Sequence, residues 1–490
     1  MAAGERGGAG APVAEQPVPA ADGGHQGCDR TQNGTGAGGR GSRGGRLMRV
    51  GIIGGGVAGL AAAHHLTKNG NHAEVFEQSD FLGGQASTFD VYGGRLERGY
   101  HHLFVSDTEI TELIHELGLG EKLAWLESSV GFYYDRKIWD FATPMDLLRF
   151  KPLGFFQRIR VGLWTLLLQK TRNYQKFESI TAKDWLERRM GQNAYRVIWE
   201  PMLRGKFGEF YDRVSMTWIW GKVYLRVASR GKGGQKERLG YPMGSFGEVI
   251  DVLAQRVRDQ GGEIHTSATV TGIVESEGRA TALDVRLDGG EGERREYDAV
   301  IATTPSYVFT RLAPEMPQDY LSKLEGTQYL SAVLMVIVLD RQFTDKYWLN
   351  IADPEMPFVA LIEHTNLIDR ELYGGKHILY ISNYPSRDSE LYQKSAEDLF
   401  ELFVPHLKKI NPDFDPSWVL ERHHHKLDGA QPIVGVNYGS GIPDHRTPHR
   451  GLYLANTTQI YPEDRGTNYS VRMGNQVAQM VIDDAGGNPA

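Results

Sequence analysis

The chain has 490 residues, of which 40% are apolar and 23% are charged, which is typical of a folded globular protein with two or three domains. Its 54 basic and 61 acidic side chains give a formal net charge of −7, so it lacks the positive surface expected of a nucleic-acid-binding protein. The single cysteine, Cys28, excludes an internal disulfide and a cysteine-built metal centre, and it suits a reducing cytoplasmic setting.

Residues 1–47 differ in composition from the rest of the chain. They are rich in glycine, alanine and proline and hold almost no large apolar side chain, so they predict a disordered, Gly-rich arm. No apolar core of a secretory signal follows the N-terminus. No later stretch reaches the roughly 18–20 uninterrupted apolar residues of a membrane-spanning helix, so we expect no transmembrane segment.

The first ordered elements predict a dinucleotide site. A short β-branched strand over Arg49–Ile53 is followed by Gly54, Gly56 and Gly59 in the spacing G-x-G-x-x-G, and then by a helix-forming run. Such a strand, turn and helix N-terminus hold a pyrophosphate on unpaired N–H groups. A second strand, His72–Phe76, ends in Glu77, the position of an acid that binds the adenosine ribose.

Two further features favour FAD over NAD. The segment FLGGQAST (residues 81–88) places a second glycine pair just after the ribose acid. Near the C-terminus a strand over Leu452–Ala455 and a helix over about 468–483 predict a second βα unit. This unit could return to the first and cover the other half of an extended cofactor.

Several segments match a known superfamily. They are GGGVAGLAAAHHLTKNGNHAEVFEQSDFLGG, ERGYHHLF, LGYPMGSFGEVIDVLAQRVRDQGGEIHTSATVTGIV and YDAVIATTPSYVFTRLAP. With these the chain resembles the FAD-dependent oxidoreductases that include phytoene desaturases, protoporphyrinogen oxidases, flavin amine oxidases and, more distantly, UDP-galactopyranose mutases. The resemblance implies an α/β fold: a Rossmann-like FAD-binding domain with a discontinuous α+β substrate (cap) domain. We expect the FAD-binding domain over 48–100, 240–310 and 425–484, and the cap over 101–239 and 311–424.

The resemblance also implies which residues contact FAD. It implies that the first glycine turn binds the pyrophosphate, the acid binds the ribose and the second glycine pair lies along the ribityl side. One backbone position would contact the adenine, and the C-terminal segment would lie near the flavin. In that order the positions are Gly54, Gly56, Val57, Ala58 and Gly59; Glu77; Gly83, Gly84 and Gln85; Val270; and Asn456, Gly466, Thr467 and Asn468. Asn456 stands where the family usually has an acid, and it could still bind a ribityl hydroxyl.

The candidate catalytic residues lie in segments expected beside the flavin: His101, His102, Tyr461 and Asn468. In a strand His101 and His102 would point to opposite faces, so they would not jointly bind a metal, and no metal site is expected. The strand over 328–339 lacks the lysine found near the flavin of amine oxidases, which argues against that activity.

The favoured function is dehydrogenation of an apolar or cyclic small molecule by hydride transfer to flavin N5. Two alternatives stay open. One is a mutase-like flavoenzyme acting on a nucleotide sugar, for which Arg204, Arg465 and Arg472 could bind a diphosphate. The other is a flavin-binding redox or interaction module without turnover. The substrate identity, the electron acceptor and the oligomeric state are not determined.

Residues 147–177 form the most unusual segment of the expected cap. They contain seven basic residues and no acidic one, with aromatic side chains interspersed. Such a segment is either an ordinary cap helix with a solvated basic face, or an amphipathic surface that contacts a membrane or admits a lipid-like substrate. Peripheral contact with the cytoplasmic face of a membrane therefore stays open.

Overall fold

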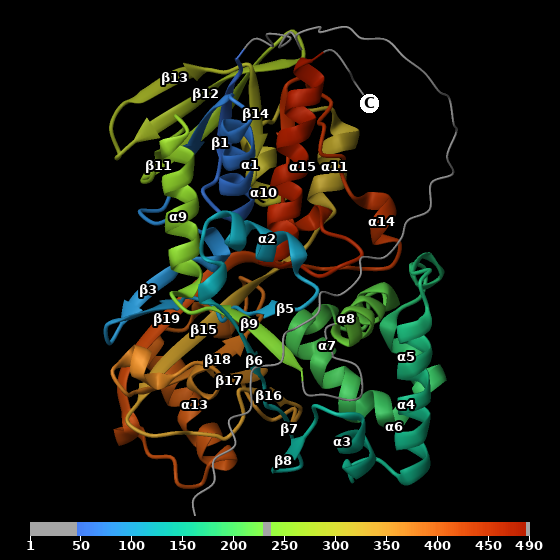
Figure 1. Ribbon diagram of the computed structural model, residues 1–490. Coiled ribbons are helices and arrows are strands. Elements are labelled where there is room, and N and C mark those ends of the chain that lie inside the picture. The colour runs from blue at the N-terminus through green and yellow to red at the C-terminus, as the bar shows by residue number, and fades with distance from the viewer. Residues whose placement is uncertain (1–46, 229–236, 487–490) are drawn as a thin grey trace, which may run out of the picture. The chain divides into compact units, whose positions relative to one another are not determined.

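The computed structural model describes residues 47–228 and 237–486 (Figure 1). The arm expected over 1–47 therefore lies outside the described residues, apart from Leu47. A five-stranded sheet, parallel throughout, has the order β10-β2-β1-β14-β20. Its strands are β1 (Arg49–Ile53), β2 (His72–Phe76), β10 (Glu263–His265), β14 (Ala299–Ala302) and β20 (Leu452–Leu454). The strands predicted at residues 49–53 and 72–76 have these bounds, and the third predicted strand ends one residue early.

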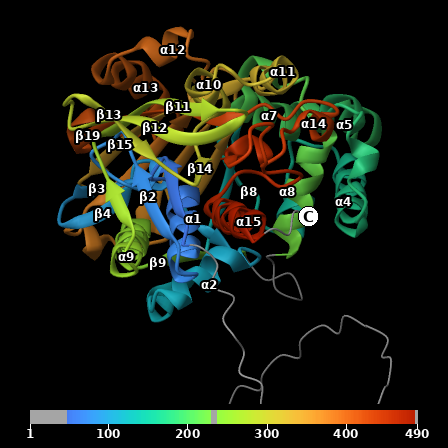
Figure 2. The same cartoon turned by 90° about the horizontal axis from the view of Figure 1, so that it is seen from above.

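Alternate side chains of the parallel strands enter two different cores. On one face Val50 and Ile52 pack with α1 (Val57–Lys68) and α15 (Thr467–Ala485), which lie side by side (Figure 2). On the other face Ile53 and Phe76 pack with an antiparallel sheet and two helices. These are β11 (Ala268–Ser276), β12 (Arg279–Leu287), β13 (Gly292–Glu296), α10 (Ser306–Leu312) and α11 (Gln318–Glu325). The parallel sheet is thus covered on both faces, as its continuous apolar strands require.

A seven-stranded sheet with the order β19-β15-β18-β17-β16-β7-β8 forms the second large unit. Its strands are β7 (Val130–Tyr134), β8 (Lys137–Asp140), β15 (Tyr329–Leu339), β16 (Trp348–Ile351), β17 (Ala360–Glu363), β18 (His377–Asn383) and β19 (Val419–Pro432). All pairs are antiparallel except β16 with β7. The apolar run of β15 is buried along nearly its whole length, and α13 (Ala396–Ile410) packs against one of its faces.

A group of helices packs around a separate core (Figure 1). The helices are α3 (Pro144–Arg149), α4 (Phe155–Lys170), α5 (Ala182–Met190), α6 (Gln192–Ala194), a π-helix (Tyr195–Trp199), α7 (Glu200–Phe207) and α8 (Met216–Ala228). Aromatic side chains dominate their core, among them Trp199, Phe207 and Trp218. None of the helices within residues 47–228 and 237–486 has the length and apolar character needed to cross a bilayer.

Shorter elements connect these units. They are β3 (Thr88–Val91) paired with β4 (Gly94–Glu97), a small sheet of β5 (Leu103–Phe104), β9 (Arg238–Pro242) and β6 (Leu123–Glu127), and the helices α2 (Thr108–Glu116), α9 (Ser245–Asp259), α12 (Glu390–Gln393) and α14 (Tyr438–Gly441). Single 3-10 turns cover Gly84–Ala86, Gly120–Lys122, Gln175–Phe177, Gly208–Phe210, His364–Asn366, Arg370–Tyr373, Pro416–Trp418 and Thr457–Gln459.

The five parallel strands all come from the segments expected to form the FAD-binding domain. One element crosses an expected boundary. β19 runs from Val419 to Pro432 and pairs with β15 as far as Pro432, so the cap sheet continues past residue 425. The main-chain pairing with β15 extends the sheet here, across a register shift between Leu427 and Gln431.

Candidate functional site

Two glycines of the first turn are required by close packing within the protein. Gly54 follows β1 with φ +107°, and a Cβ there would lie 2.5 Å from the Thr303 hydroxyl oxygen. A Cβ on Gly59 would lie inside van der Waals contact with the carbonyl oxygen of Gly54. These positions let α1 begin directly against the end of β1, as the glycine spacing predicts.

Gly56 differs, because none of the described residues fills the space beside it. A Cβ there would meet only the Cα of Gly84, at 3.9 Å. Gly56 is the N-cap of α1 and has no side chain to cap the helix, and Gly56, Val57 and Ala58 stay partly exposed. The first turn of α1 therefore presents N–H groups and the positive end of its dipole to an open cradle, which fits a pyrophosphate.

The second glycine pair forms the other wall of this cradle. The Gly83 N–H donates to the Gly55 carbonyl oxygen at 2.9 Å, and Gly56 and Gly83 form a bridge. Gly83 and Gly84 both have positive φ, and a Cβ on Gly84 would lie 3.2 Å from the Gly56 Cα. Two glycine segments about thirty residues apart thus meet at one small site.

Glu77 lies at one end of the cradle. Its two carboxylate oxygens accept the N–H groups of Gly55 at 2.8 Å and Ser79 at 2.9 Å. The carboxylate is thereby held at the end of β2 while the residue stays partly exposed, which suits an acceptor for ribose hydroxyls. The N–H of Ala268 donates to the Glu77 carbonyl oxygen, so the backbone of Val270 in β11 lies a short distance along the same edge.

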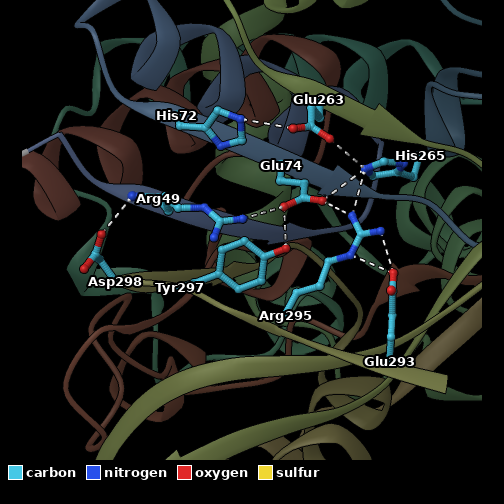
Figure 3. A network of polar contacts seen from close by, with 9 residues as sticks. All are labelled: Arg49, His72, Glu74, Glu263, His265, Glu293, Arg295, Tyr297 and Asp298. Atoms are coloured by element: carbon cyan, nitrogen blue, oxygen red, sulfur yellow. Dashed lines mark hydrogen bonds and ion pairs between the residues drawn. The ribbon is translucent and has the colours of Figure 1, made fainter.

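A second acid of β2, Glu74, has a structural environment (Figure 3). It is buried, and it accepts hydrogen bonds from Arg295 and from the Tyr297 hydroxyl, at 2.7 Å for the latter. Burial acts to raise the pKa of Glu74, but the hydrogen bonds from Tyr297 and Arg295 and the nearby positive charge hold it below its usual value. Ligand atoms of Glu74, Glu263 and His265 lie within 4.8 Å of one another. Because Arg295 already neutralises Glu74, we read the group as an ion-pair network.

Arg465 lies beyond the cradle, immediately before Gly466, the exposed N-cap of α15. Its guanidinium donates to the side-chain oxygens of Gln431 at 2.9 Å and Gln85 at 3.2 Å. Gln85 follows the second glycine pair, so this contact joins the end of the cofactor cradle to the C-terminal segment. The first turn of α15, with Thr467 and Asn468, therefore begins two residues after a direct contact with the segment of the second glycine pair.

A cluster of cations surrounds one carboxylate next to Arg465. Asp464 lies 2.6 Å from the Lys222 ammonium and 3.8 Å from that of Lys206. Burial acts to raise the pKa of Asp464, but Lys222, Lys206 and Arg465 lower it well below its usual value. Asp107 is a second acid near Lys222, and burial lowers the pKa of Lys206, so three basic side chains share two acids here.

Two tyrosines complete the cluster. The hydroxyls of Tyr100 and Tyr384 lie 3.0 Å apart, Lys206 lies over the Tyr384 ring, and Arg465 donates to the Tyr384 hydroxyl. Burial acts to raise the pKa of Tyr384, but the charges of Lys206 and Arg465 outweigh it and bring the pKa down to about 8. Burial raises the pKa of Tyr100. Tyr384 is thus the tyrosine of the pair that can release its proton near neutral pH.

The predicted histidines lie in different surroundings. His101 Nδ1 donates to the Gly99 carbonyl oxygen at 2.6 Å, and burial lowers the pKa of His101 to about 4. The ring is therefore neutral near pH 7 and keeps Nε2 as a hydrogen-bond acceptor. His102 Nδ1 lies 2.9 Å from the Tyr347 hydroxyl, and its ring packs against Trp348 of the cap sheet.

The polar atoms of three other predicted site residues are engaged within the fold. Asn468 Oδ1 accepts the N–H of Ile110 at 3.2 Å in the first turn of α2. The Asn456 amide donates to Thr304 and Ser306, and its oxygen accepts from Thr458. Tyr461 donates to Glu178 at 3.1 Å and packs in the helical core. The backbone N–H of Asn456 also donates to the Gln459 side-chain oxygen, at 2.9 Å.

The residues that sequence reasoning missed are Tyr100, Lys206, Lys222, Tyr384 and Asp464. They come from five separate segments, and no local spacing marks them. Of the three arginines considered for a diphosphate, only Arg465 lies in this cluster. Arg204 donates to Glu200 and Tyr211, and Arg472 donates to Glu463.

The fold and the cradle define an FAD-binding oxidoreductase. Residues 57–482 match the family of flavin-containing amine oxidoreductases, and the chain belongs to this family. The 15-cis-phytoene desaturase of Capsicum annuum is 22% identical over 473 residues, covering 89% of this chain and 78% of the relative. The coproporphyrinogen III oxidase of Staphylococcus aureus is 24% identical over 321 residues, covering 58% and 66%. The structure of reduced UDP-galactopyranose mutase shares the fold with a TM-score of 0.68 at 15% identity, covering 90% of this chain and 98% of that one.

Proposed function

We propose that this chain dehydrogenates a C–C or C–N single bond of an apolar or cyclic organic substrate by hydride transfer to flavin N5. The observation that carries the proposal is the cluster of three cations beyond Gln85, Lys206, Lys222 and Arg465, which outnumber the two acids near them, Asp464 and Asp107. A cationic amine would be repelled there, whereas a neutral or anionic substrate would not. Similarity to proteins named as a phytoene desaturase and a coproporphyrinogen III oxidase supports the same choice.

Bound FAD would supply the two-electron acceptor, and the residues of the chain would position the substrate and take up the proton that it loses. Tyr384 is our candidate for the residue that accepts this proton. With a pKa of about 8 it is partly ionised at a slightly alkaline pH, and Lys206 and Arg465 stabilise its phenolate. The Tyr100 hydroxyl, 3.0 Å away, can donate a hydrogen bond to it.

The test is anaerobic reduction of the FAD-loaded protein by four probes: phytoene in detergent, coproporphyrinogen III, putrescine and UDP-galactopyranose. We expect loss of the visible flavin band with phytoene or with the porphyrinogen and none with putrescine. Tyr384→Phe should bind FAD normally but slow the reduction by about 10²-fold or more, and should remove any rate dependence near pH 8. Rapid reduction by putrescine would refute the proposal.

The mutase reading has one supporting observation, the fold shared with UDP-galactopyranose mutase. It predicts that dithionite-reduced protein isomerises UDP-galactopyranose without net oxidation. A module without turnover predicts that none of the four probes is consumed by either the oxidised or the reduced protein. The separate pairing of Arg204 and Arg472 with carboxylates of their own favours dehydrogenation over the mutase reading.

A further inference from the structure

Helix α4 exposes a row of large apolar side chains. Their exposed fractions lie between 39% and 84%, with the largest at Phe156. The residues are Phe155, Phe156, Ile159, Leu163, Leu166 and Leu167. At about 100° per residue these six fall within an arc of about 120°, which we call the outer face of α4.

The opposite side of the helix is apolar as well. Val161 and Leu168 are buried there and join the core of the helical group. A helix that is apolar on both faces is normally covered on both. In both views α4 lies at the rim of the helical group (Figures 1 and 2), and the exposed fractions show that the described residues leave its outer face uncovered. The outer face is therefore a contact surface whose partner is not part of the described chain.

The charges around this surface indicate what the partner is. Residues 147–177 contain seven cations and no acid, and six of the seven are exposed: Arg149, Lys151, Arg160, Lys170, Arg172 and Lys176. Within the described part of the chain, none of the seven forms an ion pair with a carboxylate, and Arg160 donates instead to the carbonyl oxygens of Arg188 and Arg189. Their charge is thus available to an anionic partner.

A pocket beside the outer face also combines apolar side chains with cations. Its volume is about 250 Å³, and Leu167 belongs both to its lining and to the outer face. Trp164, Phe177 and Trp185 form aromatic walls, while Lys176 and Arg189 supply positive charge. The Arg189 guanidinium lies 5.0 Å from the centre of the Trp164 ring. Apolar walls with cations beside them suit a lipid chain with its phosphate headgroup.

We propose that the outer face of α4 docks on a membrane that contains anionic lipid. Its aromatic and aliphatic side chains enter the boundary between headgroups and acyl chains, while the surrounding arginines and lysines contact lipid phosphates. A protein partner would meet the same row, but a segment with seven cations, no acid and one exposed apolar helix face best matches the negative surface of a bilayer. This docking is independent of the reaction that the flavin site catalyses.

The test is co-sedimentation of the full FAD-loaded chain with vesicles. We expect binding to phosphatidylcholine vesicles that contain phosphatidylglycerol, weaker binding to phosphatidylcholine alone, and loss of that difference at high salt. F156E/L163E replaces two exposed side chains and should reduce binding at least tenfold. The matched control, L372E/L420E, replaces two exposed leucines elsewhere with the same charge change and should bind as the parent protein does.

A second variant, K151Q/K170Q, keeps the apolar row and should reduce binding to phosphatidylglycerol vesicles roughly tenfold or more. Flavin content and melting temperature show that each variant is folded. The proposal is overturned if the parent protein does not sediment with either kind of vesicle. It is also overturned if both double-glutamate variants lose binding equally. Lipid-free dimerisation that F156E/L163E abolishes, without vesicle binding, would instead identify a second copy as the partner.

Discussion

Substitution of Gly56 separates cofactor binding from folding more cleanly than any other change in the cradle. A Cβ at Gly56 would have only the Gly84 Cα nearby, at 3.9 Å, and the φ of Gly56 is −74°, which any residue adopts. Gly56→Val should therefore fold. The expected cost is about 1 kcal/mol, because valine is a poorer N-cap than glycine. Its methyl groups would occupy the space that we assign to the pyrophosphate, so FAD should not bind.

Gly59→Ala is the matched comparison, since its Cβ would collide with the Gly54 carbonyl oxygen and would lie 3.3 Å from the Thr303 hydroxyl oxygen. Relieving that overlap should cost about 3 kcal/mol, and alanine returns only about 1 kcal/mol of helix propensity. We therefore expect Gly59→Ala to lose about 2 kcal/mol of stability even without cofactor. The two variants should therefore have different defects: Gly56→Val should lose FAD binding, whereas Gly59→Ala should lose stability.

The assay is the visible flavin spectrum of each purified protein, followed by denaturation of the cofactor-free protein with and without FAD. At a hundred times its dissociation constant FAD should stabilise the parent protein by about 2.7 kcal/mol. It should not stabilise Gly56→Val. If Gly56→Val purifies yellow and gains the same stability from FAD, the pyrophosphate does not lie beside Gly56 and our reading of the cradle fails.

Three further predictions concern buried polar groups. Glu74→Ala leaves Arg295 without its buried partner and should lower the free energy of unfolding, measured in urea, by about 3 kcal/mol. The control Asp284→Ala removes an exposed partner of Arg294 and should lower it by under about 1 kcal/mol. Equal losses in the two variants would contradict the network in Figure 3. Burial raises the pKa of Glu97 to about 7, so the native carboxyl keeps a proton that the unfolded one releases, and the parent protein should lose up to about 3 kcal/mol of stability between about pH 4.5 and 7. Glu97→Gln should show a correspondingly flatter stability profile, and an unchanged profile would count against this origin. Asn468→Ala should cost about 1 kcal/mol through the lost cap of α2, with turnover per folded, flavin-loaded molecule unchanged; a fall in that turnover at constant stability would assign Asn468 to catalysis instead.

The local sequence was enough to predict which residues would meet in the cradle. The spacing of Gly54, Gly56 and Gly59, the strand ending in Glu77 and the second pair at Gly83 and Gly84 all lie within about thirty residues. Each constraint there is local: a positive φ, a close approach of helix to strand, or an acid at the end of a strand. Such constraints leave a direct trace in residue type and spacing.

The predictions of catalytic residues were less informative, because the direction of a side chain is not a local constraint. His101, His102 and Tyr461 were selected because their segments were expected beside the flavin, yet sequence does not show which way a side chain points. The structure directs His102 toward Tyr347 and Tyr461 toward Glu178, and it engages Asn468 as a cap of α2. Whether these residues also take part in the reaction stays a prediction.

The amino-acid sequence by itself determined the parallel sheet with its phosphate-binding turn, the FAD cofactor and the unusual basic character of residues 147–177. Only the tertiary structure decided that Tyr100, Lys206, Tyr384 and Arg465 meet, because these residues are up to 365 positions apart and their proximity depends on how the cap sheet and α7 pack against the C-terminal segment. It also decided which side of α4 faces outward. The helix is apolar on both sides, so its pattern alone could not distinguish the buried face from the exposed one.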